Sequence, residues 1–208
     1  MFIVKTIILW IIISTLINAY LMSLPTPVLR KRDYPASYLI QQNNRIDFQD
    51  NKECAAFSTA YLLRHFGMEA EGEALYRHFP SKTRTGTVYP KGIRTVLREK
   101  GFKTNYYKGN INTLKYEVSK GTPVIVFIKV REGYNNLHFV PVVGYDEEYI
   151  YLSESLMHLV NYDDHKSFNR KVPINEFKKL WNIKNIHMLL YSNTYITVDA
   201  TKMKKLLN

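Results

Sequence analysis

The sequence predicts an α+β domain in which helices pack on an antiparallel sheet. Helical patterns dominate the chain between residues 52 and 120, and β-branched strand patterns dominate from residue 123 onward. Helices and strands that are segregated along the chain are typical of α+β folds, whereas a parallel sheet requires them to alternate. An acidic turn at 146–148 separates two adjacent strands, which is the pattern of an antiparallel hairpin.

The first 23 residues are predicted to be a targeting segment. An uncharged run from Thr6 to Met22 follows one positive charge at Lys5, which is the pattern of a signal peptide or a signal anchor. The run has about the minimum length of a spanning helix. A buried core helix is the weaker alternative, because the run has no polar face. We expect a secreted protein or one held at the cell membrane with its domain outside, and we favour the anchor.

Composition divides the rest of the chain into three parts. Residues 24–45 are rich in Pro, Arg, Asn and Gln and are expected to be a linker. A single domain is expected over 46–198, followed by a basic tail over 199–208. The net charge of +11 suits an anionic partner, such as anionic lipid or an anionic cell-surface polymer. The positive charges are scattered and no nucleic-acid motif is present, so no nucleic-acid partner is expected.

The helical half begins with the segment that carries the only cysteine. A helix is expected from about Lys52 to Phe66, with Asp50 or Asn51 as its N-cap and Gly67 at its C-terminus. Its apolar residues are spaced to form one face. Further helices are expected over 71–78, 91–100, 111–120 and 173–181, and a polar loop over 81–90. Strands are expected over 123–130, 137–145, 149–152 and 186–191, with another at 195–198.

Cys54 is the first candidate functional residue. A lone cysteine in an exported chain cannot form an internal disulfide, so it is either an inert buried residue or a reactive one. Its position at the start of a helix favours the thiolate through the helix dipole and the unpaired backbone N–H groups. We therefore interpret Cys54 as a nucleophile.

Three further residues complete the requirements of cysteine catalysis. His138 opens one strand of the predicted hairpin and Glu154 closes the other, so a hairpin centred on residue 146 places them side by side. The imidazole would serve as the base and the carboxylate would orient it. Gln49, upstream of the cysteine, is the candidate donor to the oxyanion. The other histidines lack metal-ligand spacing and no Gly-rich phosphate loop exists, so neither a metal nor a cofactor is expected.

The order of these motifs resembles the C39-like branch of the papain-like cysteine peptidases. The resemblance lies in Gln49 to Gly67, in Gly121-Thr122-Pro123 before a strand, and in the strand from His138 to Gly144-Tyr145-Asp146, and it covers roughly residues 40–192. It implies a papain-like fold, with Cys54 as nucleophile, His138 as base, Gln49 as oxyanion donor and Glu154 in the place of the family's usual Asp.

The chain departs from the family pattern at three points. Ala55-Ala56 replaces the usual Gly-Pro after the nucleophile, only four residues separate Gln49 from Cys54, and Glu154 is one methylene longer than Asp. The predicted function is an exported or membrane-anchored cysteine peptidase that hydrolyses peptide bonds in a peptide or protein substrate. Two alternatives remain: a non-catalytic domain of the same fold that binds a peptide or an anionic wall polymer, and an acyl transferase or amidase acting on a non-protein substrate.

Overall fold

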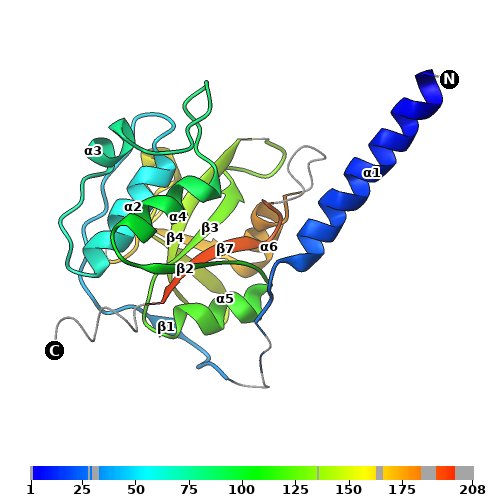
Figure 1. The fold of residues 1–208 in the computed structure, drawn as a ribbon. Coiled ribbons are helices and arrows are strands. Elements are labelled where there is room, and N and C mark those ends of the chain that lie inside the picture. The colour runs from blue at the N-terminus through cyan, green and yellow to red at the C-terminus, as the bar shows by residue number, and fades with distance from the viewer. Residues whose placement is uncertain are drawn as a thin grey trace.

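The computed structural model describes residues 2–27, 29, 33–134, 136–162, 166–183 and 191–199. It contains helices packed on an antiparallel sheet, so the predicted α+β class is confirmed (Figure 1). Over the described residues the sheet has the strand order β2-β7-β3-β4-β5-β6, and β1 pairs with β4. The strands are β1 Tyr38–Leu39, β2 Lys103–Lys108, β3 Val124–Lys129, β4 Leu137–Tyr145, β5 Tyr149–Leu152, β6 Arg170–Pro173 and β7 Thr194–Asp199. Each pairing between neighbours is antiparallel.

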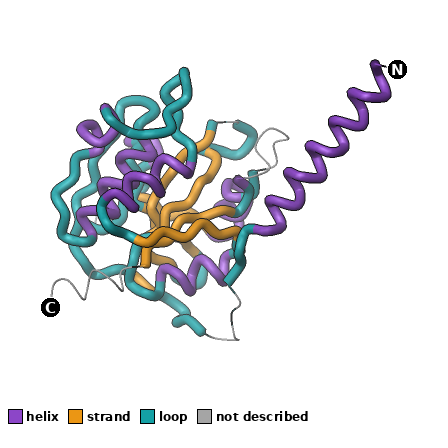
Figure 2. The backbone as a smooth tube through the Cα atoms, in the orientation of Figure 1, coloured by secondary structure: helices purple, strands orange, loops and turns teal. Residues whose placement is uncertain are grey.

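Helices cover both faces of the sheet (Figure 2). On one face α2 and α4 pack against alternate side chains of the central strands, among them Ile125 and Phe139. On the other face α5 and α6 pack against the intervening side chains, such as Val126 and Val140. This alternation follows from the two-residue period of a strand, which sends successive side chains to opposite faces. The helices are α1 Phe2–Ser23, α2 Cys54–His65, α3 Gly72–Arg77, α4 Pro90–Glu99, α5 Ile111–Val118 and α6 Ile174–Trp181, with a 3₁₀ turn at Met157–Leu159.

Helix α2 begins later than predicted. Its N-cap is Glu53, and neither Asp50 nor Asn51 caps it; instead the Glu53 carboxylate accepts the Asn51 backbone N–H at 2.7 Å. Nine consecutive residues, from Ala55 to Leu63, are buried. The helix therefore lies between the sheet and α3 and α4 rather than at the surface with one apolar face. Gly67 follows the helix with a φ of +76°, a conformation that favours glycine and fits its predicted C-terminal role.

Three strands were not predicted. β1 lies within residues 24–45, which were expected to be a linker, and it pairs with β4. β2 has the polar sequence Lys-Thr-Asn-Tyr-Tyr-Lys and forms one edge of the sheet, where only β7 pairs with it. β6 is four residues long and leads directly into α6. The prediction at 195–198 corresponds to β7. The strand predicted over 186–191 lies almost entirely outside the described residues, as does the predicted basic tail except for Asp199.

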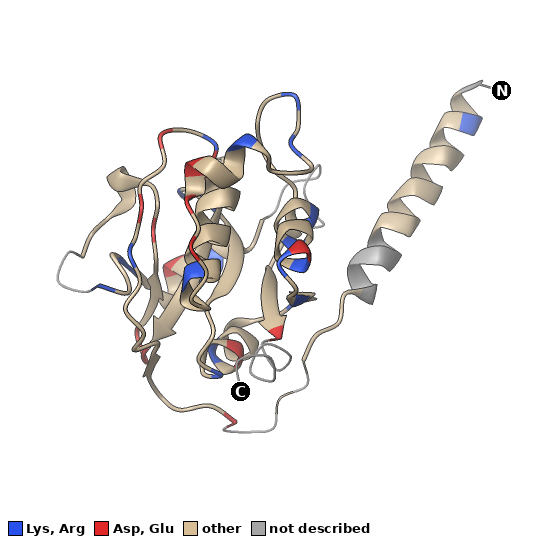
Figure 3. Cartoon of the chain, turned by 60° about the vertical axis from the view of Figure 1, so that its left-hand side comes forward, with Lys and Arg blue, Asp and Glu red and all other residues tan. Residues whose placement is uncertain are grey.

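Helix α1 projects away from the domain (Figure 1). Its apolar side chains between Ile3 and Ile17 are exposed, Trp10 for instance to 64%. Lys5 is its only charged residue, as the colours of Figure 3 show. Among the described residues, no helix reaches the length and apolar character needed to cross a membrane.

Candidate active site

The β4–β5 hairpin brings His138 and Glu154 together in a register that differs from the predicted one. Tyr145 pairs with Ile150 and Val142 with Leu152, with an irregularity between Val142 and Gly144. The Ser153 N–H then donates to the Pro141 carbonyl at 3.0 Å. The same register continued to His138 would place Leu156 opposite it, so Glu154 lies at a diagonal position on the same face.

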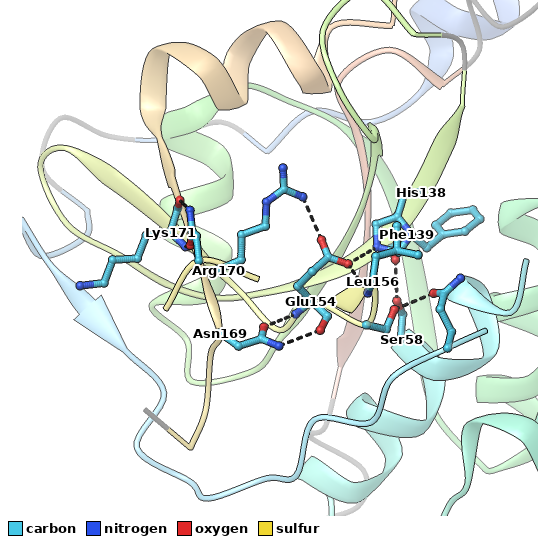
Figure 4. A network of polar contacts seen from close by, with 11 residues as sticks. Ser58, His138, Phe139, Glu154, Leu156, Asn169, Arg170 and Lys171 are labelled. Carbon is cyan, nitrogen blue, oxygen red and sulfur yellow. Dashed lines mark hydrogen bonds and ion pairs between the residues drawn. The ribbon is translucent and has the colours of Figure 1, made fainter. Parts of the chain in front are cut away.

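This offset gives the glutamate a physical role. Diagonal positions across a sheet are about 7–8 Å apart, a distance that long side chains bridge. The Oε1 of Glu154 lies 2.7 Å from Nε2 of His138, and both side chains are almost completely buried (Figure 4). The Glu154 side chain thus spans the diagonal between the two positions.

Among the described residues, the Glu154 carboxylate has three partners. Besides His138, its Oε1 accepts the Leu156 backbone N–H at 2.8 Å. Its Oε2 accepts from Nη1 of Arg170 at 2.9 Å, and the Arg170 side chain is itself buried (Figure 4). Burial raises the pKa of Glu154, but the charges of His138 and Arg170 and the hydrogen bonds outweigh it, so its pKa lies below the ordinary value. The carboxylate is therefore ionised at neutral pH.

The backbone of Glu154 is held separately by Asn169. The Asn169 Oδ1 accepts the Glu154 N–H at 2.7 Å, and its Nδ2 donates to the Glu154 carbonyl at 2.8 Å (Figure 4). The amide side chain thereby pairs with Glu154 in the manner of a neighbouring strand, one residue before the start of β6. Asn169 fixes the main chain of Glu154 while Arg170 fixes its side chain.

Cys54 approaches His138 from the opposite element. It is the first residue of α2, it is free, and it is partly exposed. The thiol lies close enough to His138 to act on the pKa of that imidazole. Since Glu154 occupies Nε2, Nδ1 is the imidazole nitrogen left for the thiol. The structure therefore brings together sulfur, imidazole and carboxylate in series.

The imidazole is poised to carry positive charge. Burial disfavours the imidazolium, but the Glu154 carboxylate and the Cys54 thiol outweigh this cost and raise the pKa of His138 above its ordinary value. The charged and hydrogen-bonding groups of the site thus act together to keep a proton on His138.

Gln49 lies close to this network but is held by other partners. Its Oε1 accepts from the Ser155 hydroxyl at 2.6 Å, and its Nε2 donates to the Asn51 carbonyl at 2.6 Å. Its backbone N–H also donates to the Ser155 carbonyl at 2.9 Å. An amide nitrogen carries two hydrogens, so one donor remains beyond the bond to Asn51. Ser155 directly follows Glu154, so the same segment positions Gln49 and the carboxylate.

Helix α2 is tied to β4 by a buried hydrogen bond. The Ser58 hydroxyl, one turn beyond Cys54, donates to the Phe139 carbonyl at 3.0 Å, directly after His138 (Figure 4). This bond links the element that carries the sulfur to the element that carries the imidazole.

Replacement of Ser58 by alanine is expected to separate these two elements slightly. We expect a loss of about 1–2 kcal/mol of unfolding free energy, because a buried carbonyl loses a partner, and thermal unfolding measures this loss. Ser119→Ala is the control, because its hydroxyl donates to the Tyr116 carbonyl within the same helical segment. A loss of stability in Ser58→Ala no larger than in Ser119→Ala would contradict the assigned role of Ser58.

Sequence reasoning missed the residues that support the site. Asn169, Arg170 and Ser155 act through contacts that depend on the β5–β6 register, and no local motif marks them. The one available signal was an arginine beside Lys171 on a short β-branched segment, which is too weak to assign. Among the described residues, no group of three or more His, Cys, Asp or Glu side chains is arranged to hold a metal ion.

Comparison with protein-family models gives a match to the peptidase C39 family over residues 42–194. Because the match covers most of the chain, the protein belongs to the peptidase C39 family. No match to a curated protein was found.

Solved structures agree with this assignment at the level of the fold. A C39-like peptidase structure from Bacillus anthracis has a TM-score of 0.57 at 19% identity, covering 77% of this chain and 96% of that one. The peptidase domain of Streptococcus ComA, a bifunctional ABC transporter of a quorum-sensing pathway, has 0.55 at 15% identity, covering 76% and 98%. The double-glycine-motif protease of an AMS/PCAT transporter, solved with its leader peptide, has 0.53 at 18% identity, covering 77% and 96%.

Proposed function

We propose that the protein is a cysteine peptidase that cleaves peptide bonds with Cys54 as nucleophile, His138 as base and acid, and Glu154 as the residue that orients the imidazole. The observation that carries the proposal is the series of contacts from the partly exposed thiol through His138 to the buried Glu154 carboxylate, at 2.7 Å for the second contact.

The chemistry follows from this order of groups. The sulfur of Cys54 attacks the peptide carbonyl carbon, and a C–S bond forms while the carbonyl π electrons move to oxygen. The His138 imidazolium then gives its Nδ1 proton to the leaving amine as the C–N bond breaks, leaving an acyl-enzyme. Water adds to that thioester with His138 accepting its proton, and the C–S bond then breaks, which releases the carboxylic acid product and returns the thiolate beside the imidazolium. Glu154 keeps Nε2 protonated and directed away from the sulfur, so Nδ1 makes each transfer.

The developing oxyanion needs donors beside the sulfur. The backbone N–H of Cys54 is in the first turn of α2, where helix geometry leaves N–H groups without intrahelical partners. The second hydrogen of the Gln49 amide is the other donor in this proposal. Fixed donors of this kind stabilise charge in the transition state without reorganisation. Ala55 and Ala56, which replace the family's Gly-Pro, are fully buried in α2 and leave the helix start intact.

The substrate class and location are also part of the proposal. A peptide or protein substrate is supported by family membership, and one structural neighbour was solved with a leader peptide. An N-terminal signal or anchor that places the domain outside the cell is supported by the exposed apolar side chains of α1. The net charge of +11 supports contact with anionic lipid or polymer at that surface.

Alkylation of Cys54 by iodoacetamide at pH 6 tests the proposed thiolate. An ordinary cysteine is almost entirely protonated at this pH, whereas a thiolate paired with an imidazolium reacts. We expect native protein to react about a hundredfold faster than the urea-unfolded chain. His138→Ala should abolish this difference in alkylation rate between native and unfolded protein. His78 is an exposed histidine far from Cys54 in the sequence, and His78→Ala should preserve the difference.

The same experiment separates the three functional classes. Labelling of the native protein no faster than that of the unfolded chain would reject both enzymatic hypotheses and leave the peptide-binding domain. Fast labelling that depends on His138, followed by cleavage of members of a peptide library, supports the peptidase. Fast labelling with no cleaved peptide would instead favour acyl transfer or amide hydrolysis on another substrate.

A further inference from the structure

The buried ion pair between Arg170 and Glu154 is not required by the hydrolysis described above. Arg170 opens β6 and is paired with Leu152 in the ladder, which places its side chain beside the end of β5. Its Nη1 contacts Oε2 of Glu154, the oxygen that does not face the imidazole. Both side chains are nearly fully buried. A buried pair of this kind costs desolvation energy, so its place in the site calls for a reason.

The contacts divide the control of Glu154 between two adjacent residues. Asn169 holds the backbone N–H and carbonyl of Glu154, and Arg170 holds the end of the side chain. With one oxygen fixed by Arg170, the other is directed at Nε2 of His138. The carboxylate has no freedom to rotate away, even though it reaches the imidazole from a diagonal position.

We propose that Arg170 is a positioning residue of the active site, which fixes the Glu154 carboxylate against His138 and withdraws part of its negative charge. The inference rests on the proposed function. It assigns to Arg170 no contact with substrate, and its action passes entirely through Glu154.

The electrostatic consequence concerns the proton on His138. A lone buried carboxylate would hold the imidazolium strongly, yet the imidazole must release its proton to the leaving amine. A guanidinium on the far oxygen weakens that hold. The ionisable groups that contact His138 and Glu154, among the described residues, are Cys54 from α2, Arg170 from β6 and these two side chains themselves. Arg170 is thus the group whose position allows it to weaken the ion pair between His138 and Glu154.

Replacement of Arg170 by methionine tests this role through the pH dependence of kcat/KM. We expect kcat to fall at least tenfold with KM little changed. We also expect the alkaline limb of the pH profile of kcat/KM to move up by about one pH unit, because His138 then keeps its proton to higher pH. Lys171→Met is the matched control: it removes the same charge from the next residue of β6, whose Nζ lies 3.8 Å from the Tyr162 ring centroid instead. An unshifted alkaline limb in Arg170→Met, or an equal shift in Lys171→Met, would overturn the proposal.

Two further variants keep the test decisive if Arg170→Met does not fold. Arg170→Lys retains the charge, so its alkaline limb should match that of the wild type while kcat falls through looser geometry. Arg170→Met in a Glu154→Gln background should leave the alkaline limb of Glu154→Gln where it is, because Arg170 acts only through the carboxylate. A displaced limb in either variant contradicts the proposal.

The wild-type protein separates this inference from the proposed function. Absence of both peptide cleavage and His138-dependent alkylation in the wild type would overturn the peptidase and, with it, the role of Arg170. An active wild type whose profile is unaltered by Arg170→Met would overturn the role of Arg170 alone. The pH dependence of iodoacetamide alkylation gives a second readout that does not depend on turnover.

Discussion

Replacement of Cys54 by alanine is expected to remove peptide hydrolysis completely, and replacement of His138 by alanine is expected to lower kcat by roughly 10⁴-fold or more. The first variant lacks the atom that is proposed to form the acyl-enzyme, and the second lacks the imidazole that lies beside that atom. Steady-state hydrolysis of a cleaved library peptide measures both losses. Because the two residues act as a unit, the double variant should be no worse than Cys54→Ala alone.

Two controls show whether the loss of activity comes from the removed groups or from unfolding of the variant. His78→Ala, which removes an exposed histidine, should leave kcat and KM unchanged. Cys54→Ala should remain folded, because the thiol is partly exposed and alanine is compatible with the first turn of a helix. A folded Cys54→Ala protein that still cleaves the peptide at an appreciable rate would show that the nucleophile lies elsewhere.

The second large effect is expected from Glu154→Ala. This change leaves the Arg170 guanidinium buried without its counter-charge and removes the acceptor from His138 and from the Leu156 N–H. Loss of one partner from a buried ion pair typically costs about 3–5 kcal/mol. We expect a loss of unfolding free energy of that size, measured by urea denaturation at pH 6, together with a fall in kcat of at least a hundredfold. Glu154→Asp separates charge from reach: it keeps the carboxylate but should still lose activity, because the shorter side chain does not span the diagonal.

The pH dependence of this stability difference has a definite sign. The pKa of Glu154 is lowered by folding, so its contribution is present above the ordinary carboxyl value of 4.5 and is lost as the pH falls through the lowered value. The pKa of His138 is raised, so its contribution is present below 6.5 and is lost as the pH rises through the raised value. The difference between wild type and Glu154→Ala should therefore be largest between about pH 4.5 and 6.5. A difference that grows steadily on either side of this range would contradict the assigned ion pair.

Local features of the chain were sufficient to predict the central part of the site. The hairpin was predictable because a short acidic turn joins two apolar strand segments. β4 carries His138 as predicted, whereas Glu154 lies two residues beyond the end of β5 rather than at its last position. The helix start at Cys54 was approximately predictable from polar residues before an apolar run. The register of the hairpin could not be predicted in the same way. The irregularity between Val142 and Gly144 does not change the alternation of apolar residues, so the sequence gives no sign of it.

Features that depend on distant pairing could not be predicted. β2 is polar because it forms an edge of the sheet, and its partner β7 lies about ninety residues further on. β6 is too short to show a pattern, yet it supplies the residues that hold Glu154. Arg170 would ordinarily be interpreted as a surface charge, and only the β5–β6 ladder places it inside. The pairing of strands that are far apart in the sequence therefore determined the features that local sequence patterns did not predict.

The division of the reactive groups between two structural elements has a consequence for the chain before it folds. Sulfur resides on α2, whereas imidazole and carboxylate reside on the sheet, and the packing of α2 on β4, fastened by the Ser58 hydroxyl, unites them. In the unfolded chain these groups are apart, so the proposed reactivity of Cys54 arises only when α2 packs on β4.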